Sequence, residues 1–225
     1  MSPFRRRCDD HLPGRLGGEP VFAVRVIAGV AGGRRLAVPP RGTRPTSDRV
    51  REALFAALEH DPGLRGANVL DVCAGSGSLG LEALSRGAAH ALFVESDRRA
   101  AAVLRRNVAE VGLPGAEVRV ASAATVLAGP PPRVYHVALL DPPYELPDRE
   151  VAGWLASAAA GGWLAADAIA IVERSARGGA FPWPERLRGV RERRYGDTTL
   201  HIADLAAPPV PADGLASHPA EAEDC

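Results

Sequence analysis

An alternation of short apolar runs with helical stretches, beginning at Asn68, constrains the fold of this chain more than any other feature. Runs such as VLDV, ALFV and VALL are continuous and apolar, as expected of parallel strands that are buried on both faces. The predicted strands are 68–73, 91–95, 117–121, 134–140 and 168–173, and the predicted helices are 78–86, 98–111, 124–127 and 148–159. Strands and helices that alternate through short connections form a doubly wound α/β sheet.

The pattern changes after Glu173, where two strand-like runs at 187–194 and 199–203 follow each other without a helix. They are joined by Tyr195-Gly196-Asp197, which favours an antiparallel hairpin at the end of the sheet. With the five earlier strands, the hairpin gives a mostly parallel, seven-stranded sheet of the Rossmann-like α/β class.

Residues 21–66 are predicted to form a small extension in front of this sheet. The runs at 24–30 and 34–38 flank a glycine-rich turn and favour a β-hairpin. A helix is predicted to begin at Asp48, where Thr46 or Ser47 can cap it and the acidic side chain lies near the positive end of the helix dipole.

The two ends of the chain have no periodic pattern. Residues 1–20 are rich in Arg, Gly and Pro, and residues 206–225 are rich in Ala, Pro and acidic residues. Such composition is typical of disordered segments, so we expect two disordered tails, the second of them acidic. The α/β domain is therefore expected to span 67–205.

Composition excludes several classes of protein. The 225 residues are 46% hydrophobic and 24% charged, which is ordinary for a globular domain. The cysteines Cys8, Cys73 and Cys225 offer neither a disulfide framework nor a CxxC metal pair. No apolar run approaches the roughly 20 residues that cross a bilayer. We therefore expect a reduced, cytoplasmic protein with neither a membrane partner nor a metal.

The net charge of zero conceals an uneven distribution. Residues 1–52 carry 11 arginines and five acidic residues, whereas residues 53–173 carry nine arginines and 14 acidic residues. A guanidinium binds phosphate through two hydrogen bonds and stacks on bases. The basic segment thus suggests a polyanionic partner, although a solvated charged face explains the charge equally well.

A glycine-rich turn connects the first predicted strand to the first helix of the α/β domain. Gly75, Gly77 and Gly80 satisfy the pattern GxGxxG, in which glycines let the backbone turn tightly and approach a ligand closely. Glu95 closes the second strand 20 residues after Gly75, where a carboxylate can accept both hydroxyls of a ribose. This arrangement suits a dinucleotide as well as S-adenosyl-L-methionine (SAM).

Asp71 distinguishes the two cofactors. A carboxylate that points into the turn repels a pyrophosphate, whereas it attracts an ammonium group such as the one on the aminocarboxypropyl arm of SAM. SAM is therefore favoured over NAD, although the turn alone does not decide between them. The expected cofactor-binding residues in the turn are Asp71, Ala74, Gly75, Ser76 and Gly77.

A second motif, Asp141-Pro142-Pro143-Tyr144, ends the fourth strand at the edge where ligands bind in open α/β sheets. An exocyclic base amine is a poor nucleophile because its lone pair is delocalised into the ring. The Asp141 carboxylate and the Pro142 carbonyl can each accept one N–H, which aims the lone pair at a methyl donor. The prolines fix this backbone, and Tyr144 offers a face on which a flipped base stacks.

With both motifs in place, the sequence resembles the RsmD-like family, whose members methylate the N(2) amine of one guanine in 16S ribosomal RNA. The resemblance covers roughly residues 25–205. It rests on DVCAGSGSLGLEALSRGA, on LLDPPY, on RVIAGVAGGRRLAVPPRGTRPTSDRVREALFAAL and on RRYGDTTL. The run at 44–52 is the most specific to the family, because DPPY is shared with DNA adenine methyltransferases.

The resemblance implies further roles for residues outside the two motifs. It implies that Arg44, Thr46 and the helix behind them cover the cofactor, and that Ser122 and Ala123 lie at its adenine. It also implies that arginines of the hairpin face RNA phosphates, although each can equally be a solvated side chain. These arginines are Arg25, Arg34, Arg35 and Arg41.

The sequence departs from the family pattern at three positions. Cys73 replaces an expected aromatic residue, which changes packing more than chemistry. Ser122 stands where such enzymes often have an Asp that bonds the adenine amine, so the adenine contact is open. Ala56 stands where Asn is usual, and no consequence follows from it.

These features predict a SAM-dependent guanine-N(2) methyltransferase whose partner is 16S rRNA, within the small ribosomal subunit or an assembly intermediate. Three alternatives remain open at this point: a DNA adenine-N(6) methyltransferase, an NAD-dependent oxidoreductase and a non-catalytic RNA-binding factor. The first normally needs a separate target-recognition segment, for which this chain has little room.

Overall fold

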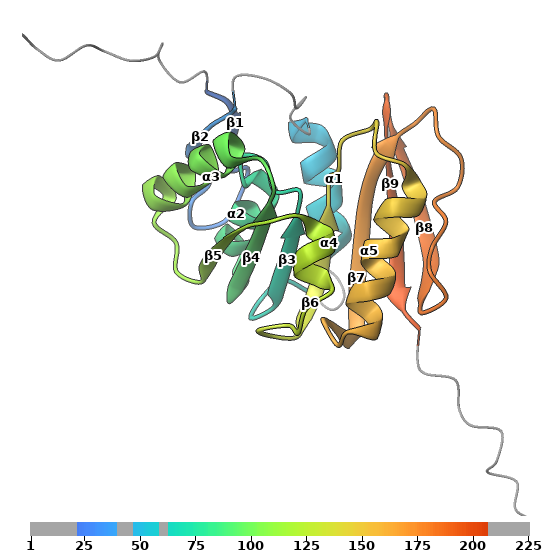
Figure 1. The fold of residues 1–225 in the computed structure, drawn as a ribbon. Coiled ribbons are helices and arrows are strands. Elements are labelled where there is room, and N and C mark those ends of the chain that lie inside the picture. The colour runs from blue at the N-terminus through green and yellow to red at the C-terminus, as the bar shows by residue number, and fades with distance from the viewer. Residues whose placement is uncertain (1–21, 40–46, 59–62, 207–225) are drawn as a thin grey trace, which may run out of the picture.

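The computed structural model describes residues 22–39, 47–58 and 63–206, and a seven-stranded sheet forms the centre of this part of the chain (Figure 1). Its order is β5-β4-β3-β6-β7-β9-β8. Strands β3 to β7 pair in parallel, whereas β9 runs antiparallel to both of its neighbours. The strands are β3 (Asn68–Val72), β4 (His90–Glu95), β5 (Ala116–Val120), β6 (Tyr135–Leu140), β7 (Leu164–Ser175), β8 (Leu187–Tyr195) and β9 (Thr198–Leu205).

Helices cover both faces of the sheet, and each face has its own apolar core. One core contains buried residues of the first three helices, and the other contains buried residues of the last two. Figure 1 shows α4 and α5 in front of the sheet and α1 behind it. The helices are α1 (Asp48–Leu58), α2 (Ser78–Ser85), α3 (Arg98–Val111), α4 (Ala123–Leu127) and α5 (Asp148–Ala160).

The predicted class, the mostly parallel sheet and the terminal hairpin are confirmed. Most element ends agree with the predicted ones to within a single residue. The main exception is β7, which begins at Leu164 instead of 168 because Leu164 pairs with Tyr135 ahead of an irregularity in the register. Two exposed residues near its start hide this part of the strand from a search for continuous apolar runs.

The N-terminal hairpin is shorter than predicted. Strands β1 (Phe22–Arg25) and β2 (Arg35–Ala37) pair antiparallel, but after the backbone hydrogen bonds of Val26 the chain turns away, so a strand over 24–30 is wrong. The reason lies in α2, whose buried Glu82 carboxylate accepts the N–H groups of Ile27 and Ala28. Because these two backbone N–H groups are bonded to a side chain of α2, they are not available for pairing with a neighbouring strand.

Helix capping follows the local sequence closely. Ser47 Oγ accepts the N–H of Val50 at 3.3 Å, as a residue that caps α1 should. In α3, the Asp97 side chain accepts two N–H groups of the first turn, and Gly112 in a left-handed conformation ends the helix. These caps account for the good agreement of the helix ends.

Some predictions fall outside the described residues, namely the two tails, Arg41, Arg44 and Thr46. The division into an extension over 21–66 and a domain over 67–205 stays a prediction, although one apolar core includes Leu36 and Leu54 of the former with Val69 and Phe93 of the latter. Among the described residues, no helix is long and apolar enough to cross a membrane.

Candidate active site

The glycine-rich turn lies where β3 ends and α2 begins, and the Asp71 side chain is completely buried beneath it. Asp71 Oδ2 accepts the N–H of Gly80 at 2.9 Å, whereas Oδ1 is buried without a hydrogen-bond partner in the described part of the chain. Burial raises the pKa of this carboxyl to about 7, opposed by the Gly80 hydrogen bond and reinforced by the nearby Asp141 and Glu95 carboxylates.

The unpaired oxygen Oδ1 of Asp71 indicates whether a cationic ligand fits the turn. Leaving a buried acceptor unpaired is unfavourable by about 1–3 kcal/mol, more if the group is charged. An ammonium group beside Oδ1 would supply both a donor and a positive charge. The residues present therefore fit the ammonium end of SAM, and they do not fit a pyrophosphate.

The three glycines of the turn have different roles. Gly75 (φ +55°) has open space where a Cβ would be, so its backbone can approach a ligand. A Cβ on Gly77 (φ +81°) would collide with Leu104, and one on Gly80 would collide with the Phe93 ring. These two are required because helix and sheet pack so closely here, which is a structural and not a ligand-binding reason.

Glu95, at the end of β4, holds the turn from the neighbouring strand. Its Oε2 accepts the N–H of Gly75 and its Oε1 accepts the N–H of Asp97, both at 2.8 Å. The side chain thus fixes the glycine turn and the start of α3 in one position. Its predicted contact with ribose hydroxyls stays a prediction.

Cys73 occupies the point where the surrounding acidic side chains converge. It is the non-glycine residue with positive φ (60°) in the described chain, so the backbone is strained in this turn. Burial, with the charges of Glu95, Asp141 and Asp71 in that order, raises the pKa of its thiol to about 12. The thiol is therefore protonated, and the three carboxylates give the site a negative potential that suits a cationic ligand.

Ser122 and Ala123, at the end of β5, form the start of α4. Ser122 Oγ accepts the N–H of Thr125 at 3.1 Å and also bonds its hydroxyl, so this side chain caps the helix. An Asp in its place would leave a second oxygen for an adenine amine, but the serine hydroxyl has less capacity left. The predicted adenine contact of this segment stays untested.

The Asp141-Pro142-Pro143-Tyr144 segment begins where β6 ends, next to the glycine turn. The N–H of Asp141 donates to the Val72 carbonyl of β3 at 3.3 Å, so the two motifs are adjacent at the carboxyl edge of the sheet, the edge at which both were expected. Asp141 is half-buried, and its charge contributes to the raised pKa of Asp71.

A buried arginine that was not predicted from the sequence, Arg174, holds the backbone of this segment. Arg174 of β7 is 6% exposed, and its guanidinium donates to the carbonyls of Pro143 (3.1 Å) and Tyr144 (3.3 Å). It also donates to the Pro142 and Leu146 carbonyls and to the Asp148 carboxylate that begins α5. A guanidinium has five N–H donors in a fixed plane, so one side chain fixes the whole segment.

Tyr144 is positioned by its hydroxyl. Its Oη lies 3.0 Å from Thr198 Oγ1 at the tip of the terminal hairpin and donates to Glu173 of β7 at 3.4 Å. The residue is nevertheless 41% exposed, so part of its ring is available to a flat ligand. No sequence signal identified Thr198 or Glu173, because they approach Tyr144 only through the pairing of β7 with β9.

Asn107 of α3 joins the extension to the glycine turn. It is completely buried; its Oδ1 accepts the N–H of Ala37, and its Nδ2 donates to the carbonyls of Ala37 and Ser76. The position of β2 and the position of the turn are therefore linked through one side chain. A polar residue on the apolar stripe of α3 is the signal that could have identified it.

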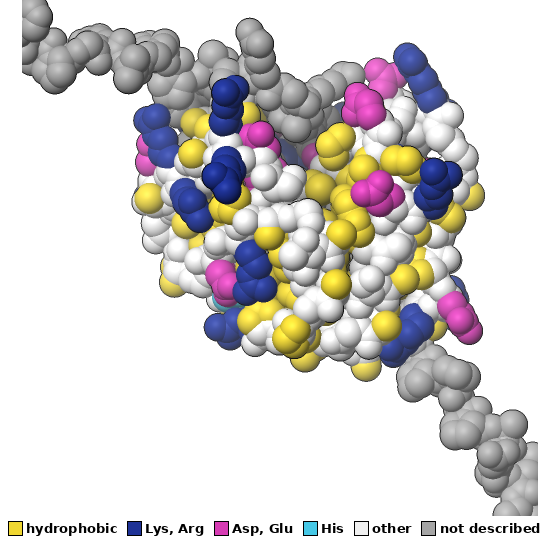
Figure 2. All heavy atoms as spheres, viewed as in Figure 1, with side chains coloured by type: hydrophobic (Ala, Val, Ile, Leu, Met, Phe, Trp, Pro, Cys, Tyr) yellow, Lys and Arg dark blue, Asp and Glu magenta, His cyan; other side chains and the backbone are white. Residues whose placement is uncertain are grey.

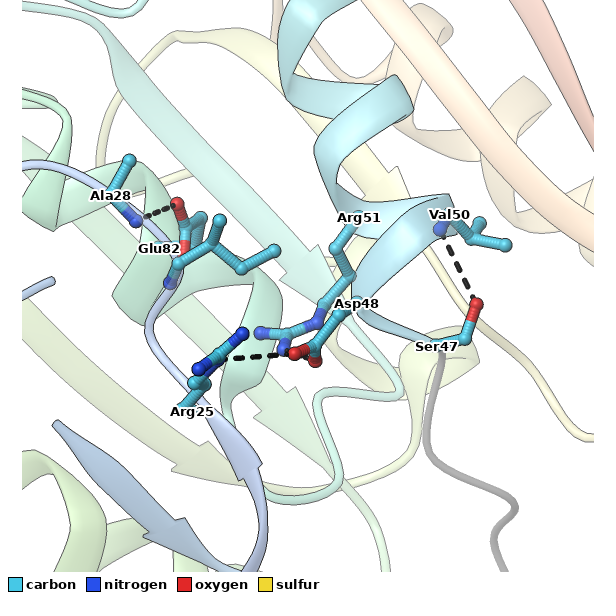
Figure 3. A network of polar contacts seen from close by, with 8 residues as sticks. Arg25, Ala28, Ser47, Asp48, Val50, Arg51 and Glu82 are labelled. Atoms are coloured by element: carbon cyan, nitrogen blue, oxygen red, sulfur yellow. Dashed lines mark hydrogen bonds and ion pairs between the residues drawn. The ribbon is translucent and has the colours of Figure 1, made fainter. Parts of the chain in front are cut away.

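The arginines predicted to bind RNA lie in different surroundings. Arg25 is exposed and pairs with Asp48 at 3.2 Å, while Arg51, fully buried on α1, bonds the other oxygen of Asp48 at 2.6 Å (Figure 3). Arg34 donates to the last carbonyls of α3, at Glu110 and Val111, and so acts as a helix cap. Arg35 is exposed, and an RNA role for any of these residues stays a prediction.

Within the described residues, no group of three or more His, Cys, Asp or Glu side chains could hold a metal ion.

Comparisons with known proteins give one consistent result. The model of a family described as "Conserved hypothetical protein 95" matches residues 24–204. The ribosomal RNA small subunit methyltransferase D of Escherichia coli K12 is 38% identical over 182 residues, which cover 80% of this chain and 88% of the relative. The Haemophilus influenzae protein of the same name is 39% identical over 154 residues, 67% of this chain and 78% of the relative.

A solved structure agrees with these relatives. The E. coli protein yhhF, described as a candidate methyltransferase, superposes with a TM-score of 0.72 at 36% identity. The match covers 82% of this chain and 99% of that one. The chain thus belongs to the RsmD-like family of ribosomal RNA small subunit methyltransferases.

Proposed function

We propose that this enzyme transfers the methyl group of SAM to the exocyclic N(2) amine of a guanine in 16S rRNA. The observation that carries the proposal is the adjacency of two half-sites at neighbouring strand ends. One is the turn above Asp71, with an orphaned acceptor, and the other begins at Asp141, whose N–H bonds the last residue of β3. A cation-binding turn beside an acceptor pair suits a sulfonium donor and an amine.

The chain's own residues hold the cofactor in three places. Asp71 Oδ1 accepts its ammonium, and the backbone of residues 74–77 surrounds its aminocarboxypropyl arm. Glu95 accepts hydroxyls of its ribose, and Ser122 and Ala123 lie at its adenine. The family resemblance adds Arg44 and Thr46, which lie outside the described residues, to the cofactor-binding set. SAM supplies an activated methyl group on a positively charged sulfur.

Asp141 and Pro142 prepare the nucleophile. The Asp141 carboxylate and the Pro142 carbonyl each accept one N–H of the amine, which orients the nitrogen lone pair and stabilises the charge that develops on nitrogen. The Pro142 carbonyl oxygen also accepts an N–H of Arg174 in a long hydrogen bond of 3.4 Å. A carbonyl oxygen has two lone pairs, so one remains available to the amine. The proton leaves the amine after methylation has made it acidic, so no further base is required.

Tyr144 receives the base. Its hydroxyl is fixed by Thr198, so the exposed ring offers a preformed platform, and stacking on such a ring contributes about 1–3 kcal/mol. Unstacking a base is unfavourable by a few kcal/mol, and less in a loop. The small subunit or an assembly intermediate, in the cytoplasm, is the proposed substrate.

The test is transfer of labelled methyl from SAM to small ribosomal subunits from a strain lacking this enzyme. We expect label in 16S rRNA, released as N(2)-methylguanine on digestion. Adenine-containing duplex DNA is included as the control substrate. Label in DNA as N(6)-methyladenine, with none in RNA, would replace the proposed substrate and retain the cofactor.

A further inference from the structure

The strand at the outer edge of the sheet, β8, presents an unusually exposed row of arginines. Eight of its nine residues are exposed or half-buried, in the sequence LRGVRERRY. Among the described residues, β8 has a strand neighbour only on its β9 side, so it lies at the edge of the sheet. The face that carries α4 and α5 differs, because basic and acidic side chains are interspersed over it (Figure 2). The arginines of β8 are Arg188, Arg191, Arg193 and Arg194.

The pairing of β8 with β9 shows which arginines share a face with the proposed base platform. Arg191 is opposite Ile202, Arg193 is opposite Leu200, and Tyr195 is opposite Thr198. Residues opposite each other in a ladder project to the same face, and side chains two apart along a strand do so too. Arg191 and Arg193 therefore form one row with Thr198, whose hydroxyl bonds Tyr144.

The acidic side chains of β8 and β9, Glu192 and Asp204, pair with residues other than Arg191 and Arg193. Glu192 projects to the opposite face, where it bonds the buried His201 at 2.9 Å. Asp204 lies 3.9 Å from Arg188 at the far end of the strand. Arg194 reaches only the Gly196 carbonyl of its own hairpin. For Arg191 and Arg193, no hydrogen bond or ion pair occurs with another described residue.

The arginines of the N-terminal hairpin are more engaged. Of its three described arginines, Arg25 pairs with Asp48 and Arg34 caps α3, so these two guanidinium groups are less available than those of the β8 row, whereas Arg35 is exposed. From this contrast we propose that Arg191 and Arg193 bind phosphates of the RNA strand that flanks the target nucleotide. The inference rests on the proposed function, and it places the entering RNA along β8 toward Tyr144.

An edge strand can also carry charge simply to prevent pairing with another sheet edge. The two explanations predict different results. Phosphate contacts release counterions from the RNA, so they determine how steeply affinity falls with salt. If the arginines serve only to prevent pairing with another sheet edge, their removal changes self-association of the protein and leaves the salt dependence of RNA affinity unchanged.

The experiment measures the affinity of R191Q/R193Q and of the parent chain for small ribosomal subunits from the strain lacking this enzyme. The salt concentration is varied from about 50 to 200 mM. We expect the slope of log affinity against log salt to fall by about 1.4–1.8, with roughly tenfold weaker binding at about 0.1 M salt. KM for the subunit rises, while kcat at saturating subunit and the Kd for SAM stay unchanged. R191K/R193K, which keeps both charges, should retain most of the slope.

The matched control is R105Q/R133Q, which removes two exposed arginines on α3 and before β6. It should leave the salt slope intact. An unchanged slope in R191Q/R193Q, or an equal loss in the control, would overturn the β8 inference, as would self-association with a normal slope. If the unmodified chain methylates no RNA at all, the proposed function itself fails, which is a separate outcome.

Discussion

The glycine turn and the Asp141–Tyr144 segment lie side by side, yet they are held in different ways. The turn is fixed by several contacts from the strands and helices that immediately surround it, through Asp71, Glu95 and Asn107. The backbone carbonyls of the Asp141–Tyr144 acceptor segment are held by one buried side chain, Arg174, which bonds three of them and the Leu146 carbonyl from a strand two elements later. Damage to the turn should therefore be partial, whereas damage to the acceptor segment should be severe.

Asp141→Ala should give the largest effect and separate the two half-sites. The variant lacks the carboxylate proposed to stabilise the charge that develops on the amine nitrogen, so kcat should fall by about 100- to 1000-fold or more. The Kd for SAM, measured by calorimetry, should change little because Asp71, the proposed acceptor of the SAM ammonium, is unchanged. An equal loss of transfer and SAM binding would show that the two half-sites do not act separately.

Arg174→Met should lower kcat by about 100-fold, because a displacement of about 1 Å in the acceptor segment is enough to do so. The Asp148 carboxylate and several carbonyls lose their donor as well, so the melting temperature should fall. Arg174→Lys, which keeps a charge but not the planar set of donors, should recover stability more than kcat. Full recovery of kcat by lysine would mean that Arg174 serves only as a buried counter-charge.

Asp71→Asn should weaken SAM binding by about tenfold, the amount expected when one charge-assisted hydrogen bond becomes neutral. The amide oxygen can still accept the Gly80 N–H, so the turn should remain folded. In the parent chain, SAM affinity should fall as pH drops through about 7, because the carboxyl of Asp71 then takes up a proton. An equally steep fall in the Asn variant would assign the pH dependence to another group.

The same carboxyl affects stability without SAM. Its folded pKa, about 7, lies above its ordinary value of 3.8, so the folded state binds the extra proton. The contribution of Asp71 is therefore fully present below about pH 4 and lost as pH rises through about 7, by up to about 4 kcal/mol. Urea unfolding of the ligand-free protein should show this loss, and Asp71→Asn should reduce it.

Tyr144→Phe should have the smallest effect, a few-fold rise in KM for the subunit, because the ring remains and only its hydroxyl contacts with Thr198 and Glu173 disappear. Tyr144→Ala should raise KM further, by the 1–3 kcal/mol or so that stacking contributes. If phenylalanine and alanine behave alike, the hydroxyl and not the ring face is what matters.

The sequence alone determined the architecture and the two motifs. Continuous apolar runs identified parallel strands, and the predicted limits of helix α3, 98–111, agree with the structure, in which local hydrogen bonds cap both of its ends. The location of both motifs at the carboxyl edge of the sheet also followed, because each ends a parallel strand. That β3 and β6 are direct neighbours, which brings Asp71 and Asp141 together, is shown only by the structure.

Only the tertiary structure revealed what supports those motifs. Arg174 reads in the sequence as one more charged residue near a strand end, and Asn107 as one polar residue of a helix. Their partners lie some 30 to 70 residues away along the chain. Arg34 likewise caps a helix that lies 76 residues further on, where the sequence suggested either an RNA contact or a solvated side chain. Local patterns determine secondary structure and motifs, whereas a buried polar side chain finds its partners only when distant segments pack together.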